Sequence, residues 1–324
     1  MGPGFGLLAG PVLERVRGKD METTGKKPTS WTRRVAGWLA GSPLTAPGRR
    51  LMEANFRDYH MPMGKAAKVM AGSWLILRDH ADGLFPPSFE DQQKAYQGEI
   101  DYFASIPGAA RERMIADHVV KPFWNSHSFG KYAADVARLM RVFEDLGVPP
   151  DGRLLELGCG CGWMAEFLAI RGHDVTGTTI ASDDVGIGEK RVDALVARGL
   201  PRRLRFRVAP METVDERVRD LGPFDATFVF EALHHAFDWR KSIQSASRTL
   251  KPGGWLVLAN EPNLAHTFVS YRVGRLTNTH EIGMSGRALR AEMRSAGLGD
   301  IRVLQPQVDN RVTAHWVAGK RPSR

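Results

Sequence analysis

The feature of the sequence that most constrains its fold is an apolar run that ends in a glycine-rich turn. Residues 154–163 read LLELGCGCGW, so that Gly158, Gly160 and Gly162 follow the apolar residues at alternate positions. Glycine has no Cβ, and a turn built from it can bring backbone N–H groups close to a bound molecule. The pattern predicts a buried strand, a ligand-binding turn and a helix, in that order.

The spacing of the glycines distinguishes between classes of ligand. A dinucleotide fingerprint has the form G-x-G-x-x-G, with a pyrophosphate on the following helix N-terminus, whereas this turn reads G-x-G-x-G. With Glu156 before it, the order E-x-G-x-G-x-G resembles the first motif of class I S-adenosylmethionine (SAM)-dependent methyltransferases. A glycine-rich turn also occurs where a strand and a helix merely pack tightly, so the assignment depends on motifs downstream.

Further segments follow in the order and at the spacing of that family. They are a second strand within residues 173–180, a third within 204–214, an apolar fourth within 224–235, a Pro-Gly-Gly turn with a fifth strand within 248–262, and two last β segments at 300–308 and 312–319. Strands that alternate with helices indicate an α/β fold with a doubly wound sheet. The resemblance implies a seven-stranded, Rossmann-like sheet with an antiparallel edge and an N-terminal helical cap.

The resemblance also implies SAM as the cofactor and assigns residues to it. At the carboxyl ends of the strands, where such sheets bind ligands, it points to Glu156, Gly158, Cys159, Gly160, Gly162, Thr179, Met211, Glu212 and Phe230. Glu156 and the glycines would contact the methionine and ribose parts of the cofactor. Met211 and Glu212 would lie near the adenine.

One position departs from the family pattern. Thr179 stands where the family usually has an acidic residue that binds the ribose hydroxyls, although a hydroxyl can still accept a hydrogen bond. Asp183 and Asp184 could replace that residue, but we favour a role as helix-starting charges. This region also resembles cyclopropane fatty acid synthases, whose bicarbonate-binding glutamate would fall at His234, so cyclopropanation is a minor alternative. A methyltransferase-like binding protein without activity is another, and Thr179 is its one indication.

Candidate catalytic residues follow the fourth strand directly, and they are Glu231, His234 and His235. Methyl transfer is an in-line attack on a sulfonium carbon, for which the protein mainly aligns the reactants and excludes water. A general base is needed only if the acceptor must lose a proton, and histidine is well suited to this near neutral pH. In the alternative interpretation, one histidine packs over the cofactor and the other caps the turn.

The sequence divides into three parts. Residues 1–50 form a basic extension that we expect to be disordered, residues 51–148 a helical cap or lid, and residues 149–324 the SAM-binding domain. Within the extension, residues 31–40 could form a helix whose apolar face includes Trp31 and Trp38. This face could rest weakly on a membrane surface, but we expect it to pack on the protein itself.

Substrate-binding residues are expected in two variable segments outside the core motifs. These residues are Phe123, Trp124, His127 and Phe129 before the first strand, and Tyr271, Arg272, Arg275 and His280 after the fifth. The aromatic residues could exclude water, and the two arginines could bind a phosphate or carboxylate or be surface charges. By resemblance we expect a small-molecule acceptor, namely a hydroxyl of a sugar-containing or natural-product metabolite.

Composition excludes several other classes of protein. Most of the net charge of +9 lies in residues 1–50, and no module interleaves basic and aromatic residues, which argues against a nucleic-acid partner. Cys159 and Cys161 share one turn without two further ligands, so we expect no metal site. Free thiols without an export signal favour the cytoplasm. No apolar run reaches the length of a membrane-spanning helix.

Overall fold

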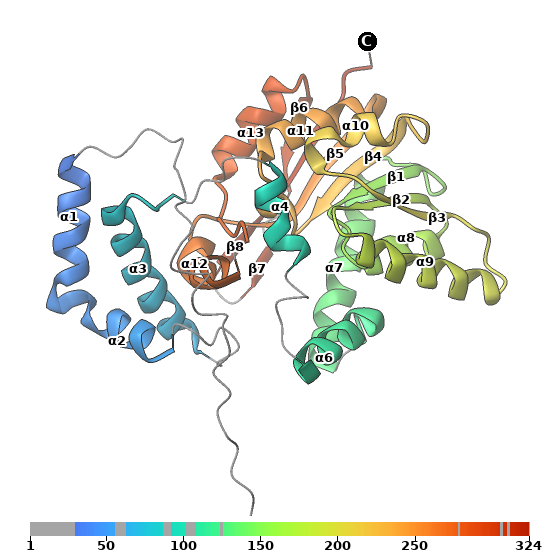
Figure 1. Cartoon of the computed structure of the whole chain (residues 1–324). Coiled ribbons are helices and arrows are strands. Elements are labelled where there is room, and N and C mark those ends of the chain that lie inside the picture. Colours follow the sequence, from blue (N-terminus) through green and yellow to red (C-terminus); the bar gives the residue numbers. More distant parts are fainter. Residues whose placement is uncertain are drawn as a thin grey trace, which may run out of the picture.

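From Arg153 onward, strands alternate with helices. The strands form one mixed β-sheet, and helices cover both of its faces (Figure 1). The computed structural model describes residues 30–55, 63–86, 92–101, 108–123, 126–277, 279–304, 307–309 and 312–323. The strands are β1 Arg153–Leu157, β2 Asp174–Thr179, β3 Leu204–Val208, β4 Phe224–Phe230, β5 Leu250–Pro262, β6 Gly299–Val303, β7 Gln307–Asp309 and β8 Val312–Lys320.

Helices precede the sheet and alternate with its strands. The helices before β1 are α1 Ser30–Gly41, α2 Ala46–Asn55, α3 Lys65–Asp82, α4 Gln92–Ile100, α6 Gly108–Val120 and α7 Ser126–Asp145. Those that follow are α8 Trp163–Arg171, α9 Ser182–Ala197, α10 Val214–Arg217, α11 Trp239–Arg248, α12 His266–Thr277 and α13 Gly286–Ser295, with short 3-10 turns η3 Met211–Thr213 and η4 Leu233–His235. No helix among the described residues is long and apolar enough to cross a membrane.

The sheet has the order β3-β2-β1-β4-β5-β8-β6, which confirms the doubly wound fold that we expected. The first five strands pair in parallel, and β8 runs antiparallel between β5 and β6. The last part differs from the sequence prediction, because the segment 300–308 is two strands. The nine-residue β8 pairs first with β7 and then, further along, with β6, so a short eighth strand joins the edge.

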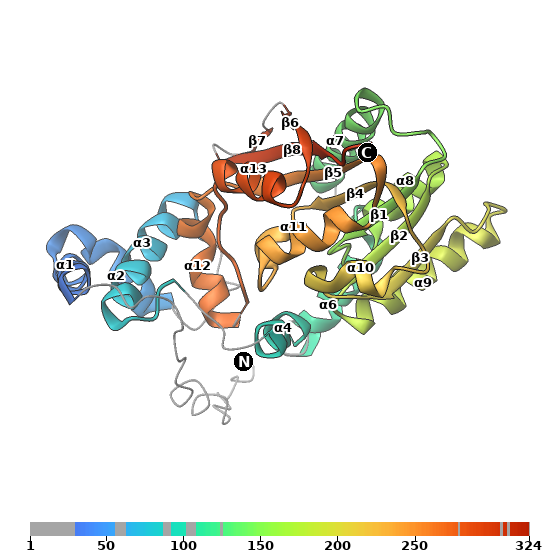
Figure 2. The same cartoon turned by 90° about the horizontal axis from the view of Figure 1, so that it is seen from above.

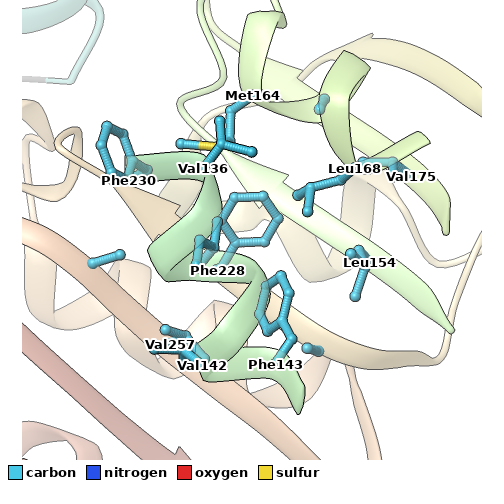
Figure 3. Close-up of a cluster of buried hydrophobic side chains, with 14 of the residues drawn as sticks. Val136, Val142, Phe143, Leu154, Met164, Leu168, Val175, Phe228, Phe230 and Val257 are labelled. Atoms are coloured by element: carbon cyan, nitrogen blue, oxygen red, sulfur yellow. The ribbon is translucent and has the colours of Figure 1, made fainter. Parts of the chain in front are cut away.

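The hydrophobic core lies in two layers, one on each face of the sheet. In β1 and β4 successive side chains point to opposite faces, so that Leu154 and Phe228 belong to one layer and Leu155 and Val229 to the other. Helices α7, α8 and α9 cover the first face, and α10, α11 and α13 cover the second (Figure 2). Phe143 of α7 packs edge-on against Phe228, with ring centroids 5.6 Å apart, a spacing typical of such pairs (Figure 3).

The N-terminal helices correct the expectation of disorder over residues 1–50. Residues 1–29 lie outside the described residues, but the chain is helical from Ser30. Helices α1, α2 and α3 pack together beside α12 (Figures 1 and 2). Their shared core includes Met52 and Trp74, and the Trp74 Nε1–H donates a hydrogen bond to the Ala40 carbonyl at 3.0 Å. This burial is what stabilises the helices, since short isolated helices are marginal in water.

The apolar face of α1 does not pack on the protein as expected. Trp31 is 65% exposed and Trp38 is 71% exposed. The small residues Gly37 and Ala40 lie toward α3 instead, where a Cβ at Gly37 would lie 3.5 Å from the Ala81 Cβ. Small side chains permit this close helix contact, so the large ones point away from it.

A buried carboxylate joins these helices to the sheet domain. Asp79 of α3 is fully buried and accepts hydrogen bonds from the Tyr271 hydroxyl at 2.9 Å and from Arg275 Nε at 2.8 Å, both on α12. Arg78 also donates to it at 2.9 Å. A buried charge is tolerated because it is paired and hydrogen-bonded.

We expect Asp79→Ala to lower the free energy of unfolding by about 3 kcal/mol, because it leaves the Tyr271 hydroxyl and the Arg275 guanidinium without their shared partner. Urea unfolding followed by circular dichroism measures this. Tyr271→Phe, which removes one hydrogen bond and keeps the ring, should cost only about 1 kcal/mol. Equal stability of Asp79→Ala and the unmodified protein would show that α3 and α12 are held by apolar contacts alone.

Candidate functional site

A cavity opens at the carboxyl ends of β1 and β4, the neighbouring strands at which the strand order reverses. It has two adjoining compartments of about 300 and about 370 Å³. Both are lined by His118, Gly158, Gly160, Asp184, Glu231 and His235. The first continues to Thr179, Met211, Tyr96 and Glu99, and the second to Glu156, Lys121, Phe230, His234, His266 and Glu281.

The glycine-rich turn forms one wall of this cavity. Gly158 has φ 67° and Gly160 has φ 50°, a region that favours glycine. A Cβ at Gly158 would lie 2.5 Å from the Met211 Cε, whereas a Cβ at Gly160 would have no protein atom within 4 Å. Gly160 therefore borders open space in the cavity and allows a ligand to approach its backbone.

Gly162, which we had assigned to the cofactor, does not line either compartment. Its Cβ would lie 2.2 Å from the Phe206 Cζ of β3. Its role is therefore to let the start of α8 pack on the sheet. The neighbouring Cys159 does line the second compartment, and its N–H donates to the Thr178 carbonyl at 2.9 Å.

Glu156, the residue before the turn, carries a buried carboxylate with an unsatisfied oxygen. Its Oε2 has no hydrogen-bond partner among the described residues. Burial raises the pKa of Glu156 to about 8, against the smaller effects of the Ala165 backbone N–H and of the Lys121 charge. An unpartnered acceptor that lines a cavity is suited to a cationic or hydroxyl-bearing group of a ligand.

The end of β2 supplies both a hydroxyl and an acid. Thr179 lines the first compartment, and the Asp184 carboxyl, in the first turn of α9, lines both. Burial, and then the charge of Asp183, raise the pKa of Asp184 to about 6. Asp184 lies in the first turn of α9, as we expected, and it also lines the cavity, where it can accept hydrogen bonds from a ligand.

Met211 and Glu212, which we expected side by side at the adenine, have different surroundings. Met211 lines the first compartment, but Glu212 is buried outside it. The Glu212 Oε2 accepts hydrogen bonds from the Tyr96 hydroxyl at 2.5 Å and from Gln92 Nε2 at 2.8 Å, both on α4. Its Oε1 accepts the Asp238 N–H at 2.9 Å. Glu212 therefore holds α4 over the mouth of the cavity instead of contacting a ligand there.

The end of β4 turns sharply into the cavity at the first candidate catalytic residue. Glu231 has φ 50°, a value that is uncommon for a residue other than glycine. Its carboxylate accepts a hydrogen bond from Asn260 Nδ2 at 3.3 Å, and Asn260 itself has φ 56°. Unusual backbone conformations of this kind occur most often at functional sites.

His234 follows and is fixed by the buried carboxylate of Glu261. Glu261 Oε1 accepts the N–H groups of Ala232 and Leu233, each at 2.9 Å, and its Oε2 lies 3.0 Å from His234 Nδ1. Because a carboxylate only accepts, the His234 Nδ1 carries a proton and donates it to Glu261. Burial alone would raise the pKa of Glu261, but the hydrogen bonds from His234 and these backbone groups lower it.

His235 lies between two further carboxylates. Its Nδ1 is 3.1 Å from Glu99 Oε1 of α4, and its Nε2 is 3.7 Å from Glu281 Oε1. Burial alone would lower the pKa of His235, but the charges of Glu281 and Glu99 outweigh it and raise the pKa to about 10. These carboxylates thus favour the protonated form of the ring.

The candidate substrate residues lie mostly away from the cavity. Phe123 is exposed and stacks on Phe129, with ring centroids 5.3 Å apart. Trp124 and the side chain of His127 lie outside the described residues. Tyr271, Arg272 and Arg275 lie on α12 and do not line the cavity, and two of them bind Asp79 instead.

His280 has direct hydrogen bonds to residues of the site. Its N–H donates to Glu99 Oε1 at 3.1 Å, and its Nδ1 donates to the His234 carbonyl at 2.7 Å. His280 therefore helps to hold in place the backbone of His234 and the Glu99 carboxylate that contacts His235. Several residues of the site were missed by sequence reasoning, because no motif marks them: Tyr96, Glu99, His118, Lys121 and Tyr132, which line the cavity, and Glu261, which binds His234.

The cavity fits the cofactor that the first motif implies. The unpartnered Oε2 of Glu156 suits an ammonium group, and the open space at Gly160 allows close backbone approach. Asp184 and Thr179 supply acceptors for hydroxyls at the end of β2. These positions come from the ends of two neighbouring strands, β1 and β2, which only the folded sheet brings together.

Comparison with known proteins supports the same interpretation. A family model described as a methyltransferase domain matches residues 124–303. A ubiquinone biosynthesis O-methyltransferase from Bordetella avium is 27% identical over 215 residues, which cover 62% of this chain and 80% of that protein. A protein of the same name from Xanthomonas axonopodis pv. citri is 30% identical over 212 residues, which cover 63% and 81%.

A solved structure shows the same fold. Magnesium protoporphyrin IX methyltransferase from Synechocystis PCC 6803, with bound S-adenosylhomocysteine, is similar with a TM-score of 0.51 at 19% identity. The match covers 69% of this chain and 98% of that one.

Glu156 should make stability depend on pH in the absence of ligand. Its pKa is raised in the folded state, so the folded protein keeps a proton that the unfolded chain loses between about pH 5 and pH 8. Relative to Glu156→Gln, we expect the free energy of unfolding to fall by about 1.4 kcal/mol per pH unit across that range. Urea unfolding of both proteins at several pH values measures this. Parallel curves for the two proteins would show that Glu156 ionises normally.

Proposed function

This chain belongs to the class I SAM-dependent methyltransferases that act on small molecules, and we propose that its acceptor atom is a hydroxyl oxygen. The cofactor supplies a methyl group on a sulfonium: the oxygen–carbon bond forms as the carbon–sulfur bond breaks, the bonding pair stays on sulfur, and the hydroxyl proton is released. The residues of the chain must therefore bind the cofactor, place the hydroxyl in line and remove its proton.

The observation that carries the proposal is the group of acids and histidines at the end of the cofactor cavity. Glu231, His234 and His235 line the second compartment together with Glu281, within one cavity that also includes Glu156 and the glycine-rich turn. A site for an acceptor that carries no proton to lose would not need such a group. The names of the relatives from Bordetella avium and Xanthomonas axonopodis support methylation at oxygen.

We assign the cofactor to Glu156, Gly158, Gly160 and Thr179, with Asp184 and Met211 beside it. Within the acceptor end, Glu231 takes the hydroxyl proton, because its carboxylate lines both compartments. His234 and His235 lie side by side at this end, and Glu261 positions His234. Residues 149–324 thus form the cofactor-binding domain, and α4 of the preceding part closes it through Tyr96 and Glu99.

Gly160→Val should weaken binding of S-adenosylhomocysteine by at least 100-fold, because the side chain would fill the space that the cofactor occupies. Isothermal titration calorimetry measures the affinity. Gly199→Val is the matched control, since Gly199 also has a positive φ, of 82°, and no protein atom near its Cβ, but does not line the cavity. Equal affinity in both variants would place the cofactor elsewhere.

Transfer of a labelled methyl group tests the reaction. Incubation with methyl-labelled SAM and a panel of catechols, phenols and methyl glycosides should give a methyl ether, which mass spectrometry identifies. Glu231→Gln should lower kcat by about 100-fold or more and change the affinity for S-adenosylhomocysteine by less than about threefold. Glu216→Gln, an exposed change on α10, is the control.

Three outcomes would contradict the proposal. Methylation at nitrogen or carbon would replace the hydroxyl acceptor. Cofactor binding without transfer to any member of the panel would favour the inactive binding protein. Full activity of Glu231→Gln would remove Glu231 from the reaction.

A further inference from the structure

The histidine and glutamate side chains at the acceptor end come within reach of a single ion. His234, His235 and Glu281 each offer one ligand atom, and these atoms all lie within 4.8 Å of one another. The two histidines come from η4, after β4, and Glu281 comes from the segment after α12. All three line the second compartment, so an ion bound there would be accessible from the cavity.

In both histidines Nδ1 is hydrogen-bonded to a carboxylate, so Nε2 is the ring nitrogen that can bind an ion. The Nδ1–H of His234 donates to Glu261, and that of His235 donates to Glu99, at 3.0 and 3.1 Å. Metal-binding histidines usually donate their other ring N–H to a carboxylate, which orients the ring and raises its basicity as a ligand. The chain supplies this arrangement twice in adjacent residues.

The spacing of the third ligand is also that of a metal site. His235 Nε2 and Glu281 Oε1 are 3.7 Å apart, too far for a good hydrogen bond. Two ligands about 2.1 Å from one ion at a tetrahedral angle would be about 3.4 Å apart. His266 Nε2 lies 3.3 Å from the other oxygen of Glu281, which leaves Oε1 facing the histidines.

The charges of the cluster favour a cation. Glu99, Glu261 and Glu281 face His234 and His235 in a region where Glu261 is fully buried. In the ion-free protein a proton on His235 offsets part of this negative charge, and an ion bound at Nε2 would displace that proton. Buried charge of one sign is costly unless it is paired, and a divalent ion at the Nε2 atoms would offset it.

We propose that His234, His235 and Glu281 bind one divalent ion, with Zn²⁺ the best match to two imidazoles and one carboxylate. Three protein ligands leave a coordination position open to the cavity, as in catalytic zinc sites. The role of the ion in the reaction rests on the proposed function: an acceptor hydroxyl in the open position would ionise more readily. We had expected no metal from the sequence, because the ligands come from two separate segments.

Metal binding is tested without any methyl acceptor. Full-length protein freed of metal with a chelator should bind one Co²⁺ per chain, with a visible d–d absorption band, and Zn²⁺ should displace it. Glu281→Gln, which keeps the shape of the side chain, and His234→Ala should each weaken Zn²⁺ binding by about 100-fold or more in calorimetry. Glu99→Gln should weaken it by about 10-fold to 100-fold, because it loosens the support of His235.

Controls separate this proposal from the proposed function. His80→Ala, which changes a histidine of α3 outside the cavity, should bind Zn²⁺ like the unmodified protein. Circular dichroism and binding of S-adenosylhomocysteine check that each variant folds. Protein that binds S-adenosylhomocysteine but gives no Co²⁺ band, or equal Zn²⁺ affinity in Glu281→Gln, overturns the metal site and leaves methyl transfer standing. Zn²⁺ binding without methyl transfer supports the site and counts against the proposed function.

Discussion

The carboxylate of Glu261 holds the site together. It is fully buried in β5, and it accepts the N–H groups of the turn after β4 as well as the Nδ1–H of His234. A buried carboxylate is stable only with such partners, so the turn cannot relax without exposing the charge. The position of His234, and of His235 beside it, follows from this one anchor. The strand that provides it is part of the core, which makes the anchor rigid.

The rest of the acceptor end is completed by segments far away in the sequence. Helix α4 brings Glu99 to His235 and Tyr96 to Glu212, so it is attached to the sheet domain by two carboxylates, its own Glu99 and Glu212 of η3. The three N-terminal helices are attached separately, through Asp79 and α12. Polar contacts with buried carboxylates, and not only apolar packing, therefore set how the preceding helices sit on the domain.

The limits of sequence reasoning can be seen at individual residues. Gly158 and Gly160 could be recognised because a tight turn against a ligand excludes side chains. Gly162 belongs to the same motif, yet its neighbour is Phe206 of β3. Glu212 follows Met211 directly but points to α4 instead of the cavity. Adjacent positions in a motif can thus have different roles, because the direction of a side chain depends on what packs beside it.

The sequence by itself determined the order of strands and helices, the glycine-rich turn and the place of the fourth strand end, because hydrophobic periodicity and backbone sterics act over a few residues. Only the tertiary structure decided which acids surround the two histidines. Glu99, Glu261 and Glu281 come from three separate segments that no local pattern marks. Their meeting depends on strand order and helix packing, and so do the charge and chemistry of the site.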